Sequence, residues 1–377
     1  VDYQNWLKQQ VSLLPAEITG GTPGTFVPVR FGTKQNLNAS VTLSQLIFDG
    51  SYLVGLQSAK TYLKISEQAK EKTELSIKEA VINAYGNVLV AEKTITILEG
   101  NKKVNDRLLN GAKQGYKNGL AEEEQVEQFE ITKGNIESNI RNAKRLRDIA
   151  YKMLNLAIGN NIDVTLTLTD DLDSLVMKNT DLNLLSKTFN VDNHIDFRIA
   201  ENDRESKRLL MKLEKSKALP RLSAFVNYGS MANSDSFNFF NSNQEWFKSS
   251  LLGVSLNIPI FSSMGRNAKT AQAKIALETS DLKLEETKKQ LSLAAQTARS
   301  NYQLSIENYE TAKKNLNLAE RIERKQQIKF KEGISTSFDL LNAQNQLYAQ
   351  QNSFVQAMLN IIANKVKLEN ALNLPIK

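Results

Sequence analysis

Few side chains in this chain could perform catalysis or hold a metal ion. There is no cysteine, which excludes a thiolate nucleophile, a thiolate metal site and a disulfide scaffold. The single histidine, His194, stands close to Asp192 and Asp196, and a histidine beside carboxylates could form a metal-ligand pair. One histidine cannot build a multi-histidine site, and no glycine-rich phosphate loop or paired-acid pattern is present. We therefore expect His194 at the surface or at a helix cap, and we predict no enzyme, cofactor or metal site.

The charge of the chain is nearly balanced. Lysine and arginine number 48 against 41 aspartate and glutamate residues, for a formal net charge of +7. The surplus is spread along the chain and forms no basic arm, so we expect no nucleic-acid partner and read the charge as solvated helix surface.

No segment is apolar enough for a membrane-spanning helix, which needs about 20 apolar residues. The longest apolar-rich candidate, Leu251–Phe261, is interrupted by Ser255, Asn257 and Pro259. A helical membrane protein is therefore excluded. The weaker signal of a membrane β-strand remains compatible with this composition.

One structural unit occurs twice in the sequence. We assign the first repeat to residues 1–158, a linker to 159–180 and the second repeat to 181–377. Four pairs of landmarks keep their order and nearly their spacing: Leu14-Pro15 with Leu219-Pro220, Val41–Phe48 with Val254–Phe261, Ala59-Lys60 with Ala273-Lys274, and Tyr116–Gly119 with Phe330–Gly333. In each repeat we expect a helix that ends near Leu-Pro, two strands, a very long helix, a glycine turn and a second long helix.

Alternation of apolar and polar residues predicts the strands. We place them at about 14–20 and 36–48 in the first repeat and at about 219–230 and 249–261 in the second. Two interpretations stay open at this level: a half-buried sheet in a water-soluble domain, or barrel strands with lipid on one face and water on the other. In the second case the lipid-facing residues are Val41, Leu43, Leu252, Val254, Leu256 and Ile258.

Long proline-free segments predict the helices, at about 51–112, 121–158, 266–332 and 336–373. The two longest would extend on the order of 90 to 100 Å at the helical rise per residue. Leu277, Leu284 and Leu291 recur every seventh residue and give a narrow apolar stripe. Helices this long and this polar cannot fold back into a compact domain, so we expect them to lie side by side in a rod, a coiled coil or a tube.

Glycine turns interrupt the helices and predict helical hairpins. Gly119 and Gly333 suit the left-handed residue that closes a helix. Ser335 or Thr336 can cap the next helix, and Asp339 lies in its first turn, where an acid suits the helix dipole. The linker at 159–180 reads as turn-rich and then β-like.

Three segments resemble the repeated signature of the TolC-like outer-membrane efflux protein family, the outer-membrane factors. They are Leu43–Gly50, Leu256–Phe261 and Phe330–Leu341, and the resemblance extends over essentially the whole chain. It implies an α+β membrane protein that forms a homotrimer. Each chain would give four strands to a transmembrane β-barrel and its long helices to an α-helical barrel, with the linker in an equatorial region. The location would be the bacterial outer membrane and the adjoining periplasm.

The resemblance also implies a function, partners and site residues. The chain would be the passive outer-membrane channel of a tripartite efflux or type I secretion system. It would contact outer-membrane lipid, a periplasmic adaptor (membrane fusion protein) and an inner-membrane RND or ABC transporter. The adaptor would dock at the hairpin tips, formed by Gly119, Leu120, Gly333, Ile334, Ser335 and Thr336, and the periplasmic entrance would be lined by Asp339, Asn342 and Gln346.

The resemblance has a limit at the entrance. The arginine and tyrosine that close it in well-known members match Ser335 and Phe330, which cannot make the same bonds, so the closing network does not carry over. For Asp339 a second role is open, in which it only complements the helix dipole.

Two further expectations come from the repeat and from the long helices. The helix expected from Thr180 to about Leu219 has no full counterpart before Leu14, so we expect about 25 residues or more of helix and a signal peptide ahead of Val1. A helical pore-forming toxin or a periplasmic coiled-coil adaptor remains as an alternative function, and no residue pattern identifies the cargo.

Overall fold

The computed structural model describes residues 1–374, which form two compact units. Unit 1 combines residues 1–61 and 205–278, and unit 2 combines 62–204 and 279–374. Each unit therefore contains residues from both sequence repeats. The boundary between the compact units does not follow the boundary between the repeats, because the longest helix of each repeat contributes residues to both units.

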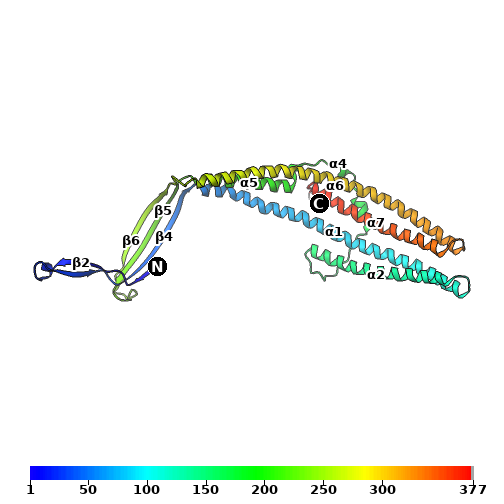
Figure 1. Cartoon of the computed structure of the whole chain (residues 1–377), viewed down its shortest axis with the longest axis horizontal. Helices are drawn as coiled ribbons and strands as arrows, with labels where there is room; N and C mark the ends of the chain where they lie inside the picture. The colour runs from blue at the N-terminus through cyan, green and yellow to red at the C-terminus, as the bar shows by residue number, and fades with distance from the viewer. Residues whose placement is uncertain (375–377) are drawn as a thin grey trace. The chain divides into compact units, whose positions relative to one another are not determined.

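Unit 1 contains an antiparallel four-stranded sheet with the order β1-β4-β5-β6. Strands β4, β5 and β6 lie side by side along most of their length (Figure 1). The bounds of the four strands are β1 Asp2–Asn5, β4 Gln35–Asp49, β5 Arg221–Ser234 and β6 Phe247–Asn257. A residue and its direct cross-strand partner share one face of a sheet, so the pairing register decides whether the apolar rows of the strands coincide.

The register brings these apolar rows together. Val41 lies opposite Tyr228, and Leu43 and Leu252 both lie opposite Val226. The other face is polar, where Ser40 lies opposite Gly229 and Thr42 opposite Asn227. The alternation of apolar and polar residues in three separate segments thus gives one sheet with an apolar face and a polar face.

Phe225, which breaks the alternation of β5, has a specific place in this sheet. It lies opposite Gly253, and a Cβ atom at position 253 would come 2.5 Å from the ring. The missing side chain of Gly253 therefore makes room for an aromatic ring on the otherwise polar face.

A second, two-stranded hairpin corrects the expectation for the first residues. Strands β2 (Gln10–Pro15) and β3 (Phe26–Phe31) pair with each other, and a 3-10 helix, η1 (Ala16–Thr19), follows β2. The strand expected at 14–20 is therefore wrong beyond Pro15, because η1 ends at Gly20 with a left-handed φ of 80°.

The same hairpin overturns one landmark of the repeat. Leu14 pairs with Val27 within the hairpin, whereas Pro220 comes directly before β5. Strands and not a helix precede Leu14-Pro15, so its equivalence to Leu219-Pro220 is wrong.

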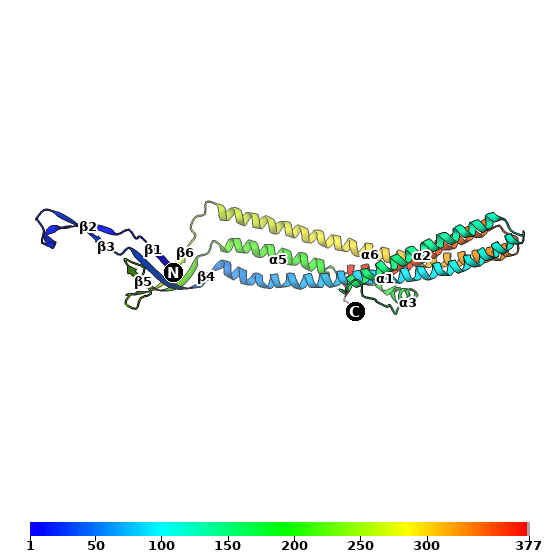
Figure 2. The same ribbon diagram turned by 90° about the horizontal axis from the view of Figure 1, so that it is seen from below.

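Four long helices form two hairpins, and the turns of both hairpins lie at the same end of unit 2 (Figures 1 and 2). The longer helices, α1 (Gly50–Lys117) and α6 (Gly265–Lys331), have 68 and 67 residues. The shorter ones, α2 (Glu123–Ala157) and α7 (Ser337–Ala371), have 35 residues each. Among the described residues, no helix contains a stretch apolar enough to cross a membrane.

Short elements between the hairpins pack onto a core of unit 2. Helix α3 (Leu172–Asn179) and helix α4 (Asn183–Ser186) surround Tyr302 of α6, whose hydroxyl accepts a hydrogen bond from the Asp181 amide at 2.9 Å and donates one to the Asn179 carbonyl at 2.7 Å. The largest buried side chains of this core include Tyr302, Leu172, Met358, Ile361 and Ile362.

Two expectations for this region are corrected. Residues 164–168 form no strand, because Leu166 and Leu168 pack against the helices and no segment within residues 1–374 pairs with this one. The helix expected from Thr180 to Leu219 is interrupted, because the backbone is extended at Lys187 and a 3-10 turn, η2, occupies Val191–Asn193. The continuous helix before β5 is α5, Ile195–Ser216.

Candidate functional site

The two hairpin turns have the same backbone geometry. Gly119 and Gly333 both have a φ of 71°, the left-handed region that favours glycine. The next amide in each turn, of Leu120 or Ile334, donates a 2.8 Å hydrogen bond to a carbonyl five residues earlier. Each turn leaves one large apolar side chain in solvent, since Leu120 is 84% and Ile334 75% exposed. The hairpin turn of each repeat thus presents an apolar contact point.

A groove of about 1290 Å³ lies between the hairpin ends. Its lining comes from all four long helices and both turns and includes Leu108, Gln128, Phe330 and Thr336. Phe338, which was not among the site residues expected from the sequence, also lines it and is largely exposed. The sequence signal that could have identified Phe338 is a large apolar side chain in the first turn of a polar helix.

The first turn of α7 holds the acidic residue selected from the sequence. Thr336 is the N-cap, and it forms a reciprocal capping box with Asp339. Hydrogen bonds from the Thr336 hydroxyl and amide hold the pKa of the Asp339 carboxyl below its usual range. Asp339, Asn342 and Gln346 are all exposed and share one side of the helix.

The strand face selected from the sequence is a second candidate surface, in unit 1. Its six selected side chains are exposed by 55 to 74%. They come from β4, β6 and the residues just after β6: Val41, Leu43, Leu252, Val254, Leu256 and Ile258. On the opposite face the Asn227 side-chain amide donates a hydrogen bond to the Thr42 hydroxyl at 2.7 Å. An apolar surface of this kind requires a partner to cover it.

His194 lies at a helix cap, one of the two places expected for it from the sequence, and not at the surface. Only 6% of the residue is exposed, and its ring lies beside that of Phe189 with the ring centroids 6.3 Å apart. Its Nδ1 accepts a 3.1 Å hydrogen bond from the Asp196 amide, which is a helix-capping contact. The Asp196 carboxylate forms an ion pair with Lys72 at 2.7 Å. These contacts give His194 and Asp196 structural roles at the start of α5.

Comparison with known proteins agrees with this arrangement. The family model described as outer membrane efflux protein matches residues 30–160 and 191–374. The outer membrane protein TolC of Vibrio cholerae serotype O1 is 22% identical over 351 residues, covering 89% of this chain and 76% of TolC. The antibiotic efflux pump outer membrane protein ArpC of Pseudomonas putida is 22% identical over 323 residues, covering 84% of this chain. The chain spans 64% of the length of ArpC.

The fold has a solved counterpart. The crystal structure of the outer membrane protein VceC from Vibrio cholerae superimposes with a TM-score of 0.72 at 15% sequence identity, covering 98% of this chain and 86% of VceC. The shared fold is α+β and dominated by helices.

The family match extends over both repeats, including both hairpin turns and strands β4, β5 and β6. A helical pore-forming toxin or a coiled-coil adaptor would not explain that extent, and the alternative function is set aside. The chain belongs to the outer membrane efflux protein family, the TolC-like channels of the outer membrane.

Proposed function

We propose that three copies of this chain assemble into one channel that leads from the periplasm through the outer membrane to the exterior. The observation that carries the proposal is the exposed apolar face of β4, β5 and β6. Lipid would cover this face, while the polar face, with Thr42 and Asn227, would border water.

The edges of the sheet support a trimer. A four-stranded sheet leaves unpaired backbone groups at both edges, which hydrocarbon cannot satisfy. Known membrane barrels have at least about eight strands, so one chain is too small to close a barrel. Three copies give an even-numbered closed barrel in which each edge pairs with the next protomer.

In this proposal the helical hairpins of the three copies form a tube in the periplasm, and the channel is a passive conduit. The tips with Leu120 and Ile334 would dock to a periplasmic adaptor, because exposed apolar side chains beside a groove suit a protein partner. An inner-membrane RND or ABC transporter would supply the energy for efflux or secretion. Asp339, Asn342 and Gln346 would line the periplasmic entrance.

Reconstitution tests the proposal. The chain is extracted in detergent, its mass is measured by native mass spectrometry, and it is added to a planar lipid bilayer. We expect the mass of a trimer and discrete ion-conducting steps. A monomer that gives no conductance would refute the proposal.

A further inference from the structure

An uncharged segment occupies most of helix α7. Charged residues make up 24% of the chain, yet the 25 residues from Leu340 to Asn364 contain no aspartate, glutamate, lysine or arginine. Ten of these 25 residues are asparagine or glutamine. The segment is therefore polar without being charged, which is unusual for an exposed helix of this length.

The amides of this segment form an exposed face. Asn342, Gln346, Ser353, Gln356 and Asn360 follow one another at intervals of three, four or seven residues, and all five are exposed. The opposite side of α7 is buried and mainly apolar, with Leu340, Leu347, Met358 and Ile361. Packing explains why the buried side of α7 is apolar. It does not explain why the exposed side carries uncharged polar residues.

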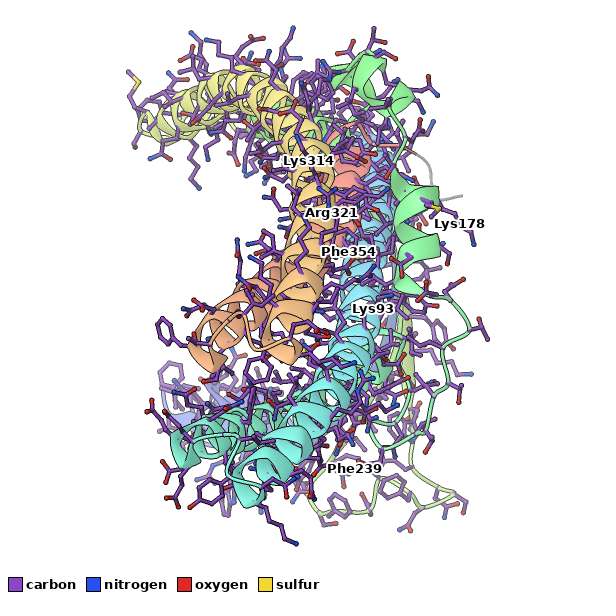
Figure 3. All side chains as sticks on the ribbon, turned by 90° about the vertical axis from the view of Figure 1, so that its right-hand side faces the viewer. Lys93, Lys178, Phe239, Lys314, Arg321 and Phe354 are labelled. Carbon is purple, nitrogen blue, oxygen red and sulfur yellow. The ribbon has the colours of Figure 1, made fainter. Side chains whose placement is uncertain are left out.

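Helix α6 continues the uncharged surface. A groove of about 630 Å³ between the two helices is lined by Asn308, Thr311 and Asn315 of α6 and by Gln350, Ser353, Gln356 and Asn360 of α7, and none of the described residues that line it is charged. Another side of α6 carries Lys313, Lys314 and Arg321, of which Figure 3 labels Lys314 and Arg321. The exclusion of charge is thus a property of one face of this hairpin.

The first hairpin repeats the pattern independently. Counted from its N-cap Glu122, helix α2 places uncharged residues at the positions equivalent to Asn342, Gln346, Ser353 and Gln356 of α7, namely Gln128, Thr132, Asn139 and Asn142. Twelve of the 35 residues of α2 are charged, but none of them falls at these positions.

Several charges of α2 have partners elsewhere. Lys133 pairs with Asp106 of α1 at 3.2 Å, and Glu137 pairs with Lys102 of α1 at 2.8 Å. After Asn142 in the sequence, this side of α2 carries the exposed apolar residues Leu146 and Ile149, so its uncharged polar face ends at Asn142.

We infer that this neutral amide face, defined by residues 342–360 of α7 and 128–142 of α2, lines the tunnel of the channel. The inference rests on the proposed trimer. Between Asp339 at the entrance and Lys367 farther along α7, the α7 lining would then carry no fixed charge. Amides and hydroxyls both donate and accept hydrogen bonds, so they can solvate solutes of either sign, whereas a ring of fixed charges favours one sign. The cargo is therefore expected to be selected by size and not by charge beyond Asp339.

The absence of cysteine makes the test direct. A single cysteine is introduced by Gln356→Cys, and the variant is inserted into a planar bilayer before labelling. It is then treated with negatively charged sulfonatoethyl or positively charged trimethylammonioethyl methanethiosulfonate. We expect the reversal potential in a salt gradient to shift toward cation preference with the first reagent and toward anion preference with the second. Lys314→Cys, on the charged side of α6, is the matched control and should show no such opposite shifts.

Each outcome has a distinct meaning. Opposite shifts at position 356 and none at 314 support the neutral lining. Complete labelling at 356, verified by mass, without any shift would place this face outside the tunnel and overturn the inference while leaving the channel intact. No labelling at 356 would place the face in a subunit contact and also overturn it. Failure of the unmodified chain to conduct would refute the proposed channel itself.

Discussion

Thr336 and Asp339 are joined by three hydrogen bonds at the first turn of α7. The Asp339 amide donates to the Thr336 hydroxyl oxygen at 3.2 Å, the Thr336 amide donates to the Asp339 carboxylate at 3.1 Å, and the hydroxyl itself donates to the carboxylate at 2.7 Å. Asp339 therefore has a structural role whether or not it also lines an entrance.

Two substitutions separate these roles. Asp339→Asn should lower the cation preference and the block by multivalent cations, because it removes the charge and keeps an oxygen that can accept from the Thr336 amide. Thr336→Ala should lower helix stability by about 1 kcal/mol and leave cation preference unchanged. Bilayer recordings and denaturant unfolding measure the two effects. Unchanged reversal potential and block in Asp339→Asn would leave the aspartate with the capping role alone.

The same contacts predict a pH dependence. Because the pKa of the Asp339 carboxyl is lowered in the folded chain, the carboxylate and its capping bonds persist as the pH falls below the ordinary pKa of aspartate. Their contribution to stability is lost only as the pH falls through the lowered value. Cation preference should therefore stay constant around neutral pH and decline in acid. A decline already near neutral pH would show that another group controls it.

The apolar strand face predicts opposite effects for neighbouring residues. Val254→Arg should destabilise the protein by roughly 2 to 4 kcal/mol if Val254 lies near the bilayer midplane. Ser255→Arg, directed to the other face, should be tolerated. The free energy of unfolding of each variant is measured by denaturant titration of the protein folded into liposomes. Lipid photo-crosslinking at position 255 but not at 254 would contradict the assignment of the faces.

Gly50 begins α1 directly after β4, where space is limited. A Cβ atom there would come 2.6 Å from Leu219 Cδ1 and 3.0 Å from the Ser216 carbonyl oxygen. Gly50→Ala should therefore cost about 1 to 3 kcal/mol through overpacking. Gly55→Ala is the control in the same helix, with nothing within 4 Å of its added methyl, and should stabilise by up to about 1 kcal/mol. Equal unfolding midpoints for the two variants would contradict the close approach at Gly50.

His194 predicts a loss of stability in mild acid. Burial lowers the pKa of its imidazole below the ordinary value of 6.5, and protonation would turn Nδ1 from an acceptor into a donor that repels the Asp196 amide. Stability from this contact is full above the unfolded pKa and is lost as the pH falls through the folded value. His194→Asn keeps a hydrogen-bond acceptor at the helix cap but has no group that titrates in the ordinary range of histidine. The melting temperature of this variant should therefore depend less on pH between about 7 and 5. An identical pH profile in both proteins would remove His194 as the cause.

Much of the local structure was readable from the sequence, because helices and turns depend on neighbouring residues. Proline-free segments and glycine turns predicted the four long helices to within a few residues, and Gly119 and Gly333 adopt the left-handed conformation expected of them. Alternation predicted β4, β5 and β6, and the motifs of both repeats predicted the family.

Tertiary structure decided the features that depend on distant residues. Leu14-Pro15 resembled Leu219-Pro220 locally, yet pairing with β3 made it part of a hairpin. The sequence allowed His194 either a surface position or a helix cap, and only packing beside Phe189 showed that its ring is buried. A one-dimensional pattern shows which side of an element is apolar, but only the folded chain determines which partner covers it. The pairing order β1-β4-β5-β6 and the uncharged groove between α6 and α7 therefore appeared only when residues far apart in sequence were brought together.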